Sequence, residues 1–554
     1  MIKINSQEWK FVGLVWLIIV FLTFLPTIIG VITTPSDSVF LGRQGINGGD
    51  LPVYYSNIEQ AKEGHFLFKN LYTSEPHPRF IFDPFWLGVG ILAKVFSLSA
   101  FLAFQLSKFL LIPIFLIVSY YLLAFFFKDE TRRKVCFIFL IFASGLGGLY
   151  FASYSSQFSK TGDVFVFSEM EMSHLPLDVF TADVFTFFSI YNSPHFLASL
   201  TLIVLIFLLS LLAFESYKLI YSLGAGCSAL FLFQFHPYHL PTIFGVLGIF
   251  ILLFILKEKK LNLNYLKHYF ILLVFSLPPI FYYILTIQKF WIRRAHFLQF
   301  ATPIPSLPIV FVSYGFLIIF ALIGIFSILK KKEKNKQDIF LVSWTLTSFL
   351  LIYSPLPFQR RLAEGLQVAL AILTTFGLFY LRNWLEEKPI FQKYFKEIFS
   401  NKIFLTYLFF ILFFFSSFLM IINDLSLYLK HYYRMYLTKE AQEAMFWLRK
   451  NTKEESIVLS SFETGNLIPA FSLRQVYLGH GHQTVQLRKK LVEAEQFFQN
   501  SNDDEKLTFL KDNQIDYLFF GPEEKKEIRF NPEEKSYLKK VFSNNEVAVF
   551  KTDY

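Results

Sequence analysis

The feature that most constrains this chain is a series of apolar runs, each long enough to cross a lipid bilayer. A transmembrane helix needs about 20 mostly apolar residues. Eleven segments of the 554-residue sequence fall in this range, and few ionisable side chains lie within them. They are 10–32, 100–127, 135–153, 195–214, 218–235, 240–256, 268–288, 307–329, 338–354, 363–381 and 402–422. The sequence therefore predicts an all-α polytopic membrane bundle.

Composition supports this prediction and excludes other classes. The chain is 54% hydrophobic and 17% charged, whereas a soluble domain carries about a quarter charged residues. The net charge of +10 could suggest nucleic acid, but most lysines and arginines flank apolar runs and indicate membrane topology instead. Cys136 and Cys227 both lie inside apolar runs, so they predict neither a disulfide framework nor a metal cluster.

The basic segments between the apolar runs predict how the chain crosses the plasma membrane. We assign the short run Pro84–Ala93 as interfacial or re-entrant, because it is too short to span. With the N-terminus in the cytoplasm, the strongly basic segments then face inward, as the positive-inside rule favours. These segments are 128–134, 257–260, 330–336 and 382–402.

The remaining long segments are predicted to be extracytoplasmic. The first two external loops cover 33–99 and 154–194. Residues 423–554 combine a helical pattern at 439–451 with strand-like runs at 456–461, 515–521 and 546–551. This alternation predicts a small soluble α/β domain, and an odd number of spans places it outside. We therefore expect a transmembrane domain over 1–422 and an extracytoplasmic α/β domain over 423–554.

Acidic residues in the two external loops are candidates for chemistry. Asp50 ends the segment GINGGD just beyond the first span, where flexible glycines can hold a carboxylate near the headgroup plane. A solvated turn aspartate would give the same pattern. Asp178 and Asp183 precede a span that opens with His195. These residues would equally suit helix caps at the membrane interface.

An arginine pair opens the tenth span on the predicted outer side. Arg360 and Arg361 oppose the positive-inside trend, and Glu364 follows them. Arginine matches the geometry of phosphate, which favours an anion clamp. Snorkelling side chains, with one charge neutralised by Glu364, are the alternative. Arg293 and Arg294 in the third external loop could belong to the same clamp.

These features together resemble the GT-C superfamily of polytopic membrane glycosyltransferases, which includes protein O-mannosyltransferases and the aminoarabinose transferase of lipid A. The resemblance covers nearly the whole chain. It rests on Asp50 in a long first external loop, the acidic second loop and the external C-terminal domain. The order of four further segments adds to it: YTSEPHPRF, NSPHF, HPYHLPT and FQRRLAEGL.

The resemblance implies an inverting transfer of a sugar from a polyprenyl-phosphate-linked donor to a glycan, lipid or protein acceptor outside the membrane. It assigns Asp50 as general base or metal ligand, and it matches the second-loop acid of the family to Asp183, with Asp178 close behind. The resemblance leaves open whether the chain binds a divalent metal, Mg²⁺ or Mn²⁺; Asp50 and Asp183 would be its ligands. The residues expected to bind substrate are Arg360, Arg361, Glu364, His77, His195, Arg293 and Arg294. Asp50 and the arginine pair are expected to open onto one extracytoplasmic cavity.

Other functions remain open at this point. A secondary transporter would usually place ionisable groups near the membrane midplane, and the spans hold almost none there. A flippase or polymerase of lipid-linked sugars would share the phosphate clamp, and an inactive scaffold would share the fold. The segment GHGHQT (479–484) offers two histidines but no third ligand, so we expect a structural role for it.

Overall fold

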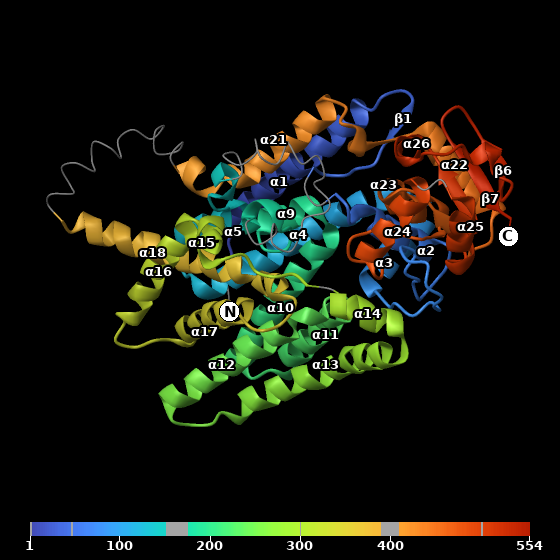
Figure 1. The fold of residues 1–554 in the computed structure, drawn as a ribbon. Coiled ribbons are helices and arrows are strands. Elements are labelled where there is room, and N and C mark those ends of the chain that lie inside the picture. Colours follow the sequence, from blue (N-terminus) through green and yellow to red (C-terminus); the bar gives the residue numbers. More distant parts are fainter. Residues whose placement is uncertain are drawn as a thin grey trace. The chain divides into compact units, whose positions relative to one another are not determined.

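The computed structural model describes residues 3–45, 48–150, 175–299, 301–388, 409–499 and 502–553 (Figure 1). Parts of two predicted spans, 151–153 and 402–408, and most of the second external loop, 154–174, lie outside these residues. The chain divides into two compact units. The first unit comprises 1–26, 107–282 and 301–424, and the second comprises 27–106, 283–300 and 425–554.

The first unit is built from helices. Its elements are α1 (Ser6–Ile32), α4 (Ala100–Phe126), α5 (Glu130–Phe142), α8 (Leu177–Phe180), α9 (Thr186–Asn192), α10 (Pro194–Ser216), α11 (Leu219–Phe235), η1 (Pro237–His239), α12 (Leu240–Glu258), α13 (Leu263–Lys289), α15 (Leu307–Tyr314), α16 (Phe316–Leu329), α17 (Lys336–Ile352), η2 (Gln359–Ala363), α18 (Leu366–Glu386) and α21 (Phe415–Leu429). Helices α1, α4, α13 and α21 also contribute residues to the second unit.

The helices confirm a multi-pass membrane protein. Among the described residues, seven helices are long and apolar enough to cross a bilayer, and a bent pair makes an eighth. That pair is α15 and α16, which meet at 88° around Gly315, whose φ of +50° favours glycine. Helices α11 and α17 are 17 residues long, so these predicted spans are shorter than the usual length.

Close helix packing and buried charge hold the first unit together. A Cβ on Gly324 of α16 would lie 2.1 Å from the Leu373 carbonyl oxygen of α18, so these two helices need small residues to approach so closely. Near the N-terminus, Arg133 of α5 binds buried Glu8 of α1 with an Nε–Oε1 distance of 2.8 Å. Tyr120 of α4 donates to the same carboxylate at 2.8 Å, so one network ties three helices.

The second unit combines the predicted first external loop, 33–99, with the C-terminal residues. Its elements are β1 (Ser38–Phe40), α2 (Leu51–Lys62), α3 (Pro84–Val95), α14 (Trp291–Gln299), η3 (Tyr433–Met435), β2 (Tyr436–Thr438), α22 (Lys439–Asn451), β3 (Ile457–Leu459), α23 (Phe462–Ser472), β4 (Gln475–Val476), α24 (Leu487–Gln499), α25 (Asp503–Asp512), β5 (Tyr517–Phe520), α26 (Pro522–Glu527), η4 (Pro532–Glu534), β6 (Leu538–Ser543) and β7 (Ala548–Thr552). The predicted short run becomes α3, a helix of 12 residues, which is too short to span.

The predicted α/β domain is present as a five-stranded mixed sheet. The strand order is β4-β3-β5-β7-β6, with β3 parallel to β4 and β5 and the β5–β7–β6 pairs antiparallel. Helices α22 to α26 accompany this sheet in the orange and red part of the chain (Figure 1). The expected all-α bundle with a small α/β domain is therefore confirmed as the fold class.

The first external loop is part of the core of the second unit. Strand β1 pairs antiparallel with β2, joining Ser38–Phe40 to Tyr436–Thr438. Leu41 and Tyr72 pack in the same apolar cluster as Val458 of the sheet. The predicted division at 422/423 follows the change in composition, whereas in the structure the loop packs with the C-terminal residues.

Candidate functional site

In the second unit, Asp50 lies at the start of α2, just before a proline-containing first turn. An aspartate at this position usually caps its helix by accepting a backbone N–H, but this one makes no such bond. Its Oδ1 instead lies 2.9 Å from Nε2 of His480, and the Asp50 side chain is 38% exposed. The carboxylate is therefore both anchored and accessible to solvent.

The hydrogen bonds of His480 define its tautomer. The backbone N–H groups of His482 and Gln483 both donate to Nδ1 of His480 at 3.1 Å. Because Nδ1 accepts, the proton of the neutral ring is on Nε2, which donates to Asp50. The imidazole is only 6% exposed. His480 is therefore a neutral, fixed donor to one oxygen of Asp50.

A second set of contacts fixes the backbone before Asp50. The Asn466 amide of α23 donates to the Gly49 carbonyl at 3.2 Å, and its oxygen accepts from Arg43. Tyr428 in turn donates to the carbonyl oxygen of Arg43 at 2.6 Å. Burial lowers the pKa of Arg43 to about 10, so the guanidinium stays charged at neutral pH. These contacts preorganise the Asp50 turn.

The other predicted site residues of the second unit have local partners. His77 pairs through Nδ1 with the Glu75 carbonyl at 2.7 Å, and its Nε2 accepts the Asn70 N–H at 3.2 Å. Arg293 lies over the Tyr283 ring, 4.8 Å from its centroid. Arg294 donates to the carbonyl of Gln288 at 3.2 Å. Both ring nitrogens of His77 thus serve to brace its loop.

In the first unit, the structure brings together residues from the second external loop and the tenth predicted span. Arg361 of η2 binds Asp183 with an Nη1–Oδ2 distance of 2.8 Å, and the two side chains are 16% and 1% exposed. The Arg361 guanidinium also lies 5.4 Å from the centroid of the Phe196 ring. Arg360 lies over the ring of Phe180 at 5.3 Å. The arginine pair is therefore held by one acid and two aromatic rings.

Asp178 has a different environment. Its Oδ2 accepts the backbone N–H groups of Gly145 and Gly147 at 3.0 Å each. A Cβ on Gly147 would lie 1.9 Å from Oδ1 of Asp178, so the close approach requires glycine. Burial raises the pKa of Asp178 to about 7. This carboxyl group holds the turn that follows α5.

Three further polar side chains of the first unit meet where η1 and η2 contact each other. His236 precedes η1, His239 ends it, and Glu364 follows η2. Nε2 of His239 lies 2.8 Å from Oε2 of Glu364, and both side chains are fully buried. His195 packs edge-on against His236 with 5.2 Å between ring centroids, and its Nδ1 lies 2.7 Å from the Ser193 hydroxyl.

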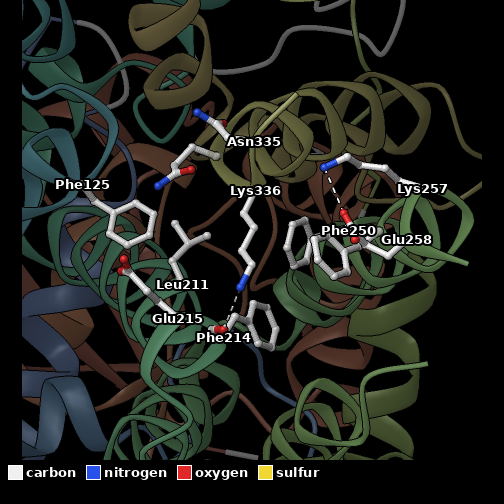
Figure 2. A pocket seen from close by; sticks show the side chains of 11 residues that line it. Phe125, Leu211, Phe214, Glu215, Phe250, Lys257, Glu258, Asn335 and Lys336 are labelled. Atoms are coloured by element: carbon white, nitrogen blue, oxygen red, sulfur yellow. Dashed lines mark hydrogen bonds and ion pairs between the residues drawn. The ribbon is translucent and has the colours of Figure 1, made fainter. Parts of the chain in front are cut away.

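A separate cavity of about 440 Å³ lies at one end of α10, α12 and α17. Figure 2 shows Lys336 pointing into it, where Nζ donates to the Phe214 carbonyl at 3.3 Å. Lys257 pairs with Glu258 at 3.0 Å beside it. The lysines belong to segments that the sequence places on the cytoplasmic side. None of the predicted site residues lines this cavity.

The described residues do not group Asp50 or Asp183 with further metal ligands. Within the described part of the chain, one group of three ligand residues has its donor atoms within 4.8 Å of one another, and it consists of His236, His239 and Glu364. Oδ1 of Asp50 accepts a hydrogen bond from Nε2 of His480, and Oδ2 of Asp183 binds Arg361. The predicted Mg²⁺ or Mn²⁺ site of Asp50 and Asp183 stays a prediction.

Sequence reasoning missed the roles of three histidines. His480 lies in GHGHQT, which we expected to be structural, and its partner Asp50 is 430 residues away. His236 and His239 lie in HPYHLPT, which contributed only to the family resemblance. The two histidines three residues apart around a proline were the available signal, but Glu364 is 125 residues from His239.

The chain is similar in fold to solved structures of membrane proteins. No protein-family model and no curated protein matches the sequence. The chain matches the solved structure of the Archaeoglobus fulgidus oligosaccharyltransferase tethered with an acceptor peptide containing the NVT sequon, with a TM-score of 0.56 and 15% identity over 93% of this chain and 69% of that chain.

Two further structures match in the same way. The archaeal oligosaccharyltransferase AglB from Archaeoglobus fulgidus, in complex with an inhibitory peptide and a dolichol-phosphate, gives a TM-score of 0.50 and 15% identity over 93% of this chain and 69% of that chain. ArnT from Cupriavidus metallidurans bound to undecaprenyl phosphate gives 0.51 and 11% identity over 99% and 98%. The chain therefore has the fold of the GT-C membrane glycosyltransferases.

Proposed function

We propose that this chain is a membrane glycosyltransferase that moves a sugar from a polyprenyl-phosphate-linked donor to an acceptor hydroxyl on the extracytoplasmic side. Two solved structures of the same fold contain dolichol-phosphate or undecaprenyl phosphate, and a third structure contains an acceptor peptide. These ligands support the class of donor and the existence of a separate acceptor. The proposal includes a cytoplasmic N-terminus and an extracytoplasmic C-terminal domain.

The observation that carries this proposal is the Asp50–His480 pair. A general base needs one oxygen within reach of the acceptor and a fixed orientation. His480 binds Oδ1 of Asp50 at 2.9 Å, while the Asp50 side chain keeps 38% of its surface exposed. A neutral histidine holds the carboxylate without neutralising it. Asp50 can then take a proton on Oδ2.

The proposed reaction is a single displacement. Oδ2 of Asp50 accepts the proton of the acceptor hydroxyl as its oxygen bonds to the anomeric carbon. The bond between that carbon and the phosphate oxygen breaks through an oxocarbenium-like state, and both its electrons leave with the polyprenyl phosphate. The configuration at the anomeric carbon inverts. A positioned base contributes about 10²–10⁴-fold to such a reaction.

We assign binding of the donor phosphate to Arg360 and Arg361. Phosphate leaves with its charge, so cationic groups stabilise it without a proton. Asp183 binds one nitrogen of Arg361, which fixes the plane of the guanidinium, and the adjacent Phe196 ring limits its rotation. In this proposal Asp183 positions Arg361, and Asp178 supports the neighbouring turn, so neither takes the proton.

The test is sugar transfer by the purified full chain in liposomes that contain polyprenyl-phosphate-linked sugars. The comparison is Asp50→Asn with Asp37→Asn, since Asp37 is an exposed acid of the same loop. We expect a loss of about 10²–10⁴-fold for Asp50→Asn and no change for Asp37→Asn. Equal turnover by both variants contradicts the assignment of Asp50, and solute flux without sugar transfer supports a transporter instead.

A further inference from the structure

We propose that His236, His239 and Glu364 bind a transition-metal dication of the zinc class. This site goes beyond the proposed function, which gives these three residues no role, and metal binding can be measured without any sugar transfer. It also differs from the Mg²⁺ or Mn²⁺ site that the sequence suggested at Asp50 and Asp183.

The spacing of the three donor atoms suits a single ion. One ligand atom from each residue lies within 4.8 Å of the other two. In a tetrahedral zinc site, ligand atoms are roughly 3.3–3.6 Å apart, because each lies about 2.0–2.2 Å from the metal. Small side-chain rotations are enough to close this difference. The distance of 2.8 Å between His239 Nε2 and Glu364 Oε2 already brings two ligands together.

The same three residues leave buried polar atoms without hydrogen-bond partners. These atoms are Nδ1 of His236, Nδ1 of His239 and Oε1 of Glu364. Buried polar groups are nearly always paired, and exceptions call for a ligand or a functional explanation. Three unpaired atoms on three adjacent residues form a cluster. The His239–Glu364 contact uses Nε2 and Oε2, so the unpaired atoms of these two residues are their other possible ligand atoms. A cation would bind through one atom of each residue.

Local backbone geometry places these ligands with little freedom. Pro237 interrupts the helical run between α11 and α12, so that His236 and His239 lie at the two ends of the short helix η1. Gly365 adopts a φ of +85° directly after Glu364, a conformation that favours glycine. The carboxylate therefore leaves η2 just before α18 begins. Two turns thus present all three ligands.

The donor set selects the metal. Imidazole nitrogens favour zinc and similar transition metals, whereas Mg²⁺ prefers oxygen ligands and retains water. Two histidines and one glutamate are also the ligands of known catalytic zinc sites, which keep a fourth position open. We assign that fourth position to water or to an anionic oxygen.

The experiment uses the purified full chain in detergent, with an affinity tag that contains no histidine. Metal content after incubation with Zn²⁺ and gel filtration is measured by mass spectrometry, and Co²⁺ is used as a spectroscopic probe. We expect about one Zn²⁺ per chain and the strong visible absorption of four-coordinate Co²⁺. Thermal unfolding with Zn²⁺ and with a chelator should show a higher Tm in the presence of zinc.

The variants are His236→Gln, Glu364→Gln and, as a control, His431→Gln, because His431 is an exposed histidine of the second unit. Loss of supporting residues around metals weakens binding about 10–100-fold, so loss of a direct ligand should weaken Zn²⁺ binding at least as much. His431→Gln should bind normally. Full zinc content in both ligand variants overturns the proposal.

Wild-type protein tests the proposal even where a variant does not fold. If the folded wild-type chain retains no Zn²⁺ and its Tm is the same with zinc and with chelator, the His239–Glu364 contact is a buried hydrogen bond and the proposal is wrong. If zinc raises the Tm of the wild type and not that of Glu364→Gln, the metal site is supported. Neither result depends on whether the chain transfers sugar.

Discussion

Asp50 and Asp183 both lie in loops that the sequence predicts to be external, but their surroundings differ. Asp50 in the second unit accepts from a neutral histidine and is 38% exposed, whereas Asp183 in the first unit binds an arginine and is 1% exposed. A general base needs a carboxylate oxygen that a substrate can reach, whereas an acid that orients an arginine can be buried. Two acids with similar sequence contexts therefore suit different roles. Asp50 suits a general base, because its partner is neutral and its side chain is exposed, whereas Asp183 suits positioning of Arg361, because its partner is charged and its side chain is buried.

The largest expected effect on stability comes from breaking the Asp183–Arg361 pair. Asp183→Asn leaves the arginine charge largely buried without its counter-ion, which typically costs about 3–5 kcal/mol of unfolding free energy. Thermal unfolding in detergent should show a clearly lower Tm than for Asp50→Asn, which should unfold like the wild type. The double variant Asp183→Asn/Arg361→Gln should have a higher Tm than Asp183→Asn, because it also removes the unpaired charge. An unchanged Tm for Asp183→Asn contradicts this view of the pair.

A second prediction concerns the positioning residue of Asp50. His480→Phe removes the donor and should lower kcat by roughly 10²-fold, since small misplacements of reacting groups have effects of this size. The KM for donor should stay nearly constant. His480→Gln retains an N–H donor and should recover part of kcat. His431→Gln is the matched control, and equal kcat values for all three variants would show that His480 does not position Asp50.

A third prediction uses the pH dependence of stability. Asp178 has a pKa raised from 3.8 to about 7 by burial, so the folded chain binds this proton more tightly than the unfolded chain. The stabilisation is fully present below about pH 4 and is lost as the pH rises towards 7, by about 1.4 kcal/mol per pH unit at most. Asp178→Asn should remove this component. If the Tm difference between wild type and variant stayed constant from pH 4 to 7, this prediction for Asp178 would be wrong.

The smallest expected effect is at an exposed pair in the second unit. Arg79 binds Glu454 while their side chains are 23% and 47% exposed. Exposed ion pairs contribute about 0.2–1 kcal/mol and weaken with salt. Arg79→Gln should therefore change the Tm only slightly, and less at high salt. If Arg79→Gln lowered the Tm as much as Asp183→Asn does, buried and exposed ion pairs would not differ in their contribution to stability.

The sequence predicted those features that depend on local pattern. Helix α22 begins at Lys439 and ends at Asn451, the limits that its helical pattern indicated. Strands β3, β5 and β7 lie at the three strand-like runs that the sequence predicted, whereas β4 and β6 were not predicted. The short apolar run at 84–93 was correctly separated from the spans, because its length alone decides whether it can cross a bilayer.

Features that depend on distant contacts could not be predicted. Asp183 and Arg361 are 178 residues apart, and no periodicity relates them. The packing of Leu41 and Tyr72 with the C-terminal sheet follows from tertiary burial, whereas composition changes only near 422. His480 seemed to lack chemistry because its sequence neighbours offer no third ligand, and its role depends on a carboxylate from the other end of the chain.

The most direct test of the central claim compares single-turnover sugar transfer by Asp50→Asn and Asp183→Asn at saturating donor, normalised to the folded fraction. The account predicts that Asp50→Asn is slower than the wild type by about 10²–10⁴-fold, while folded Asp183→Asn retains most of its rate and shows a raised KM for donor. A wild-type rate for Asp50→Asn, together with a folded but inactive Asp183→Asn, would contradict it.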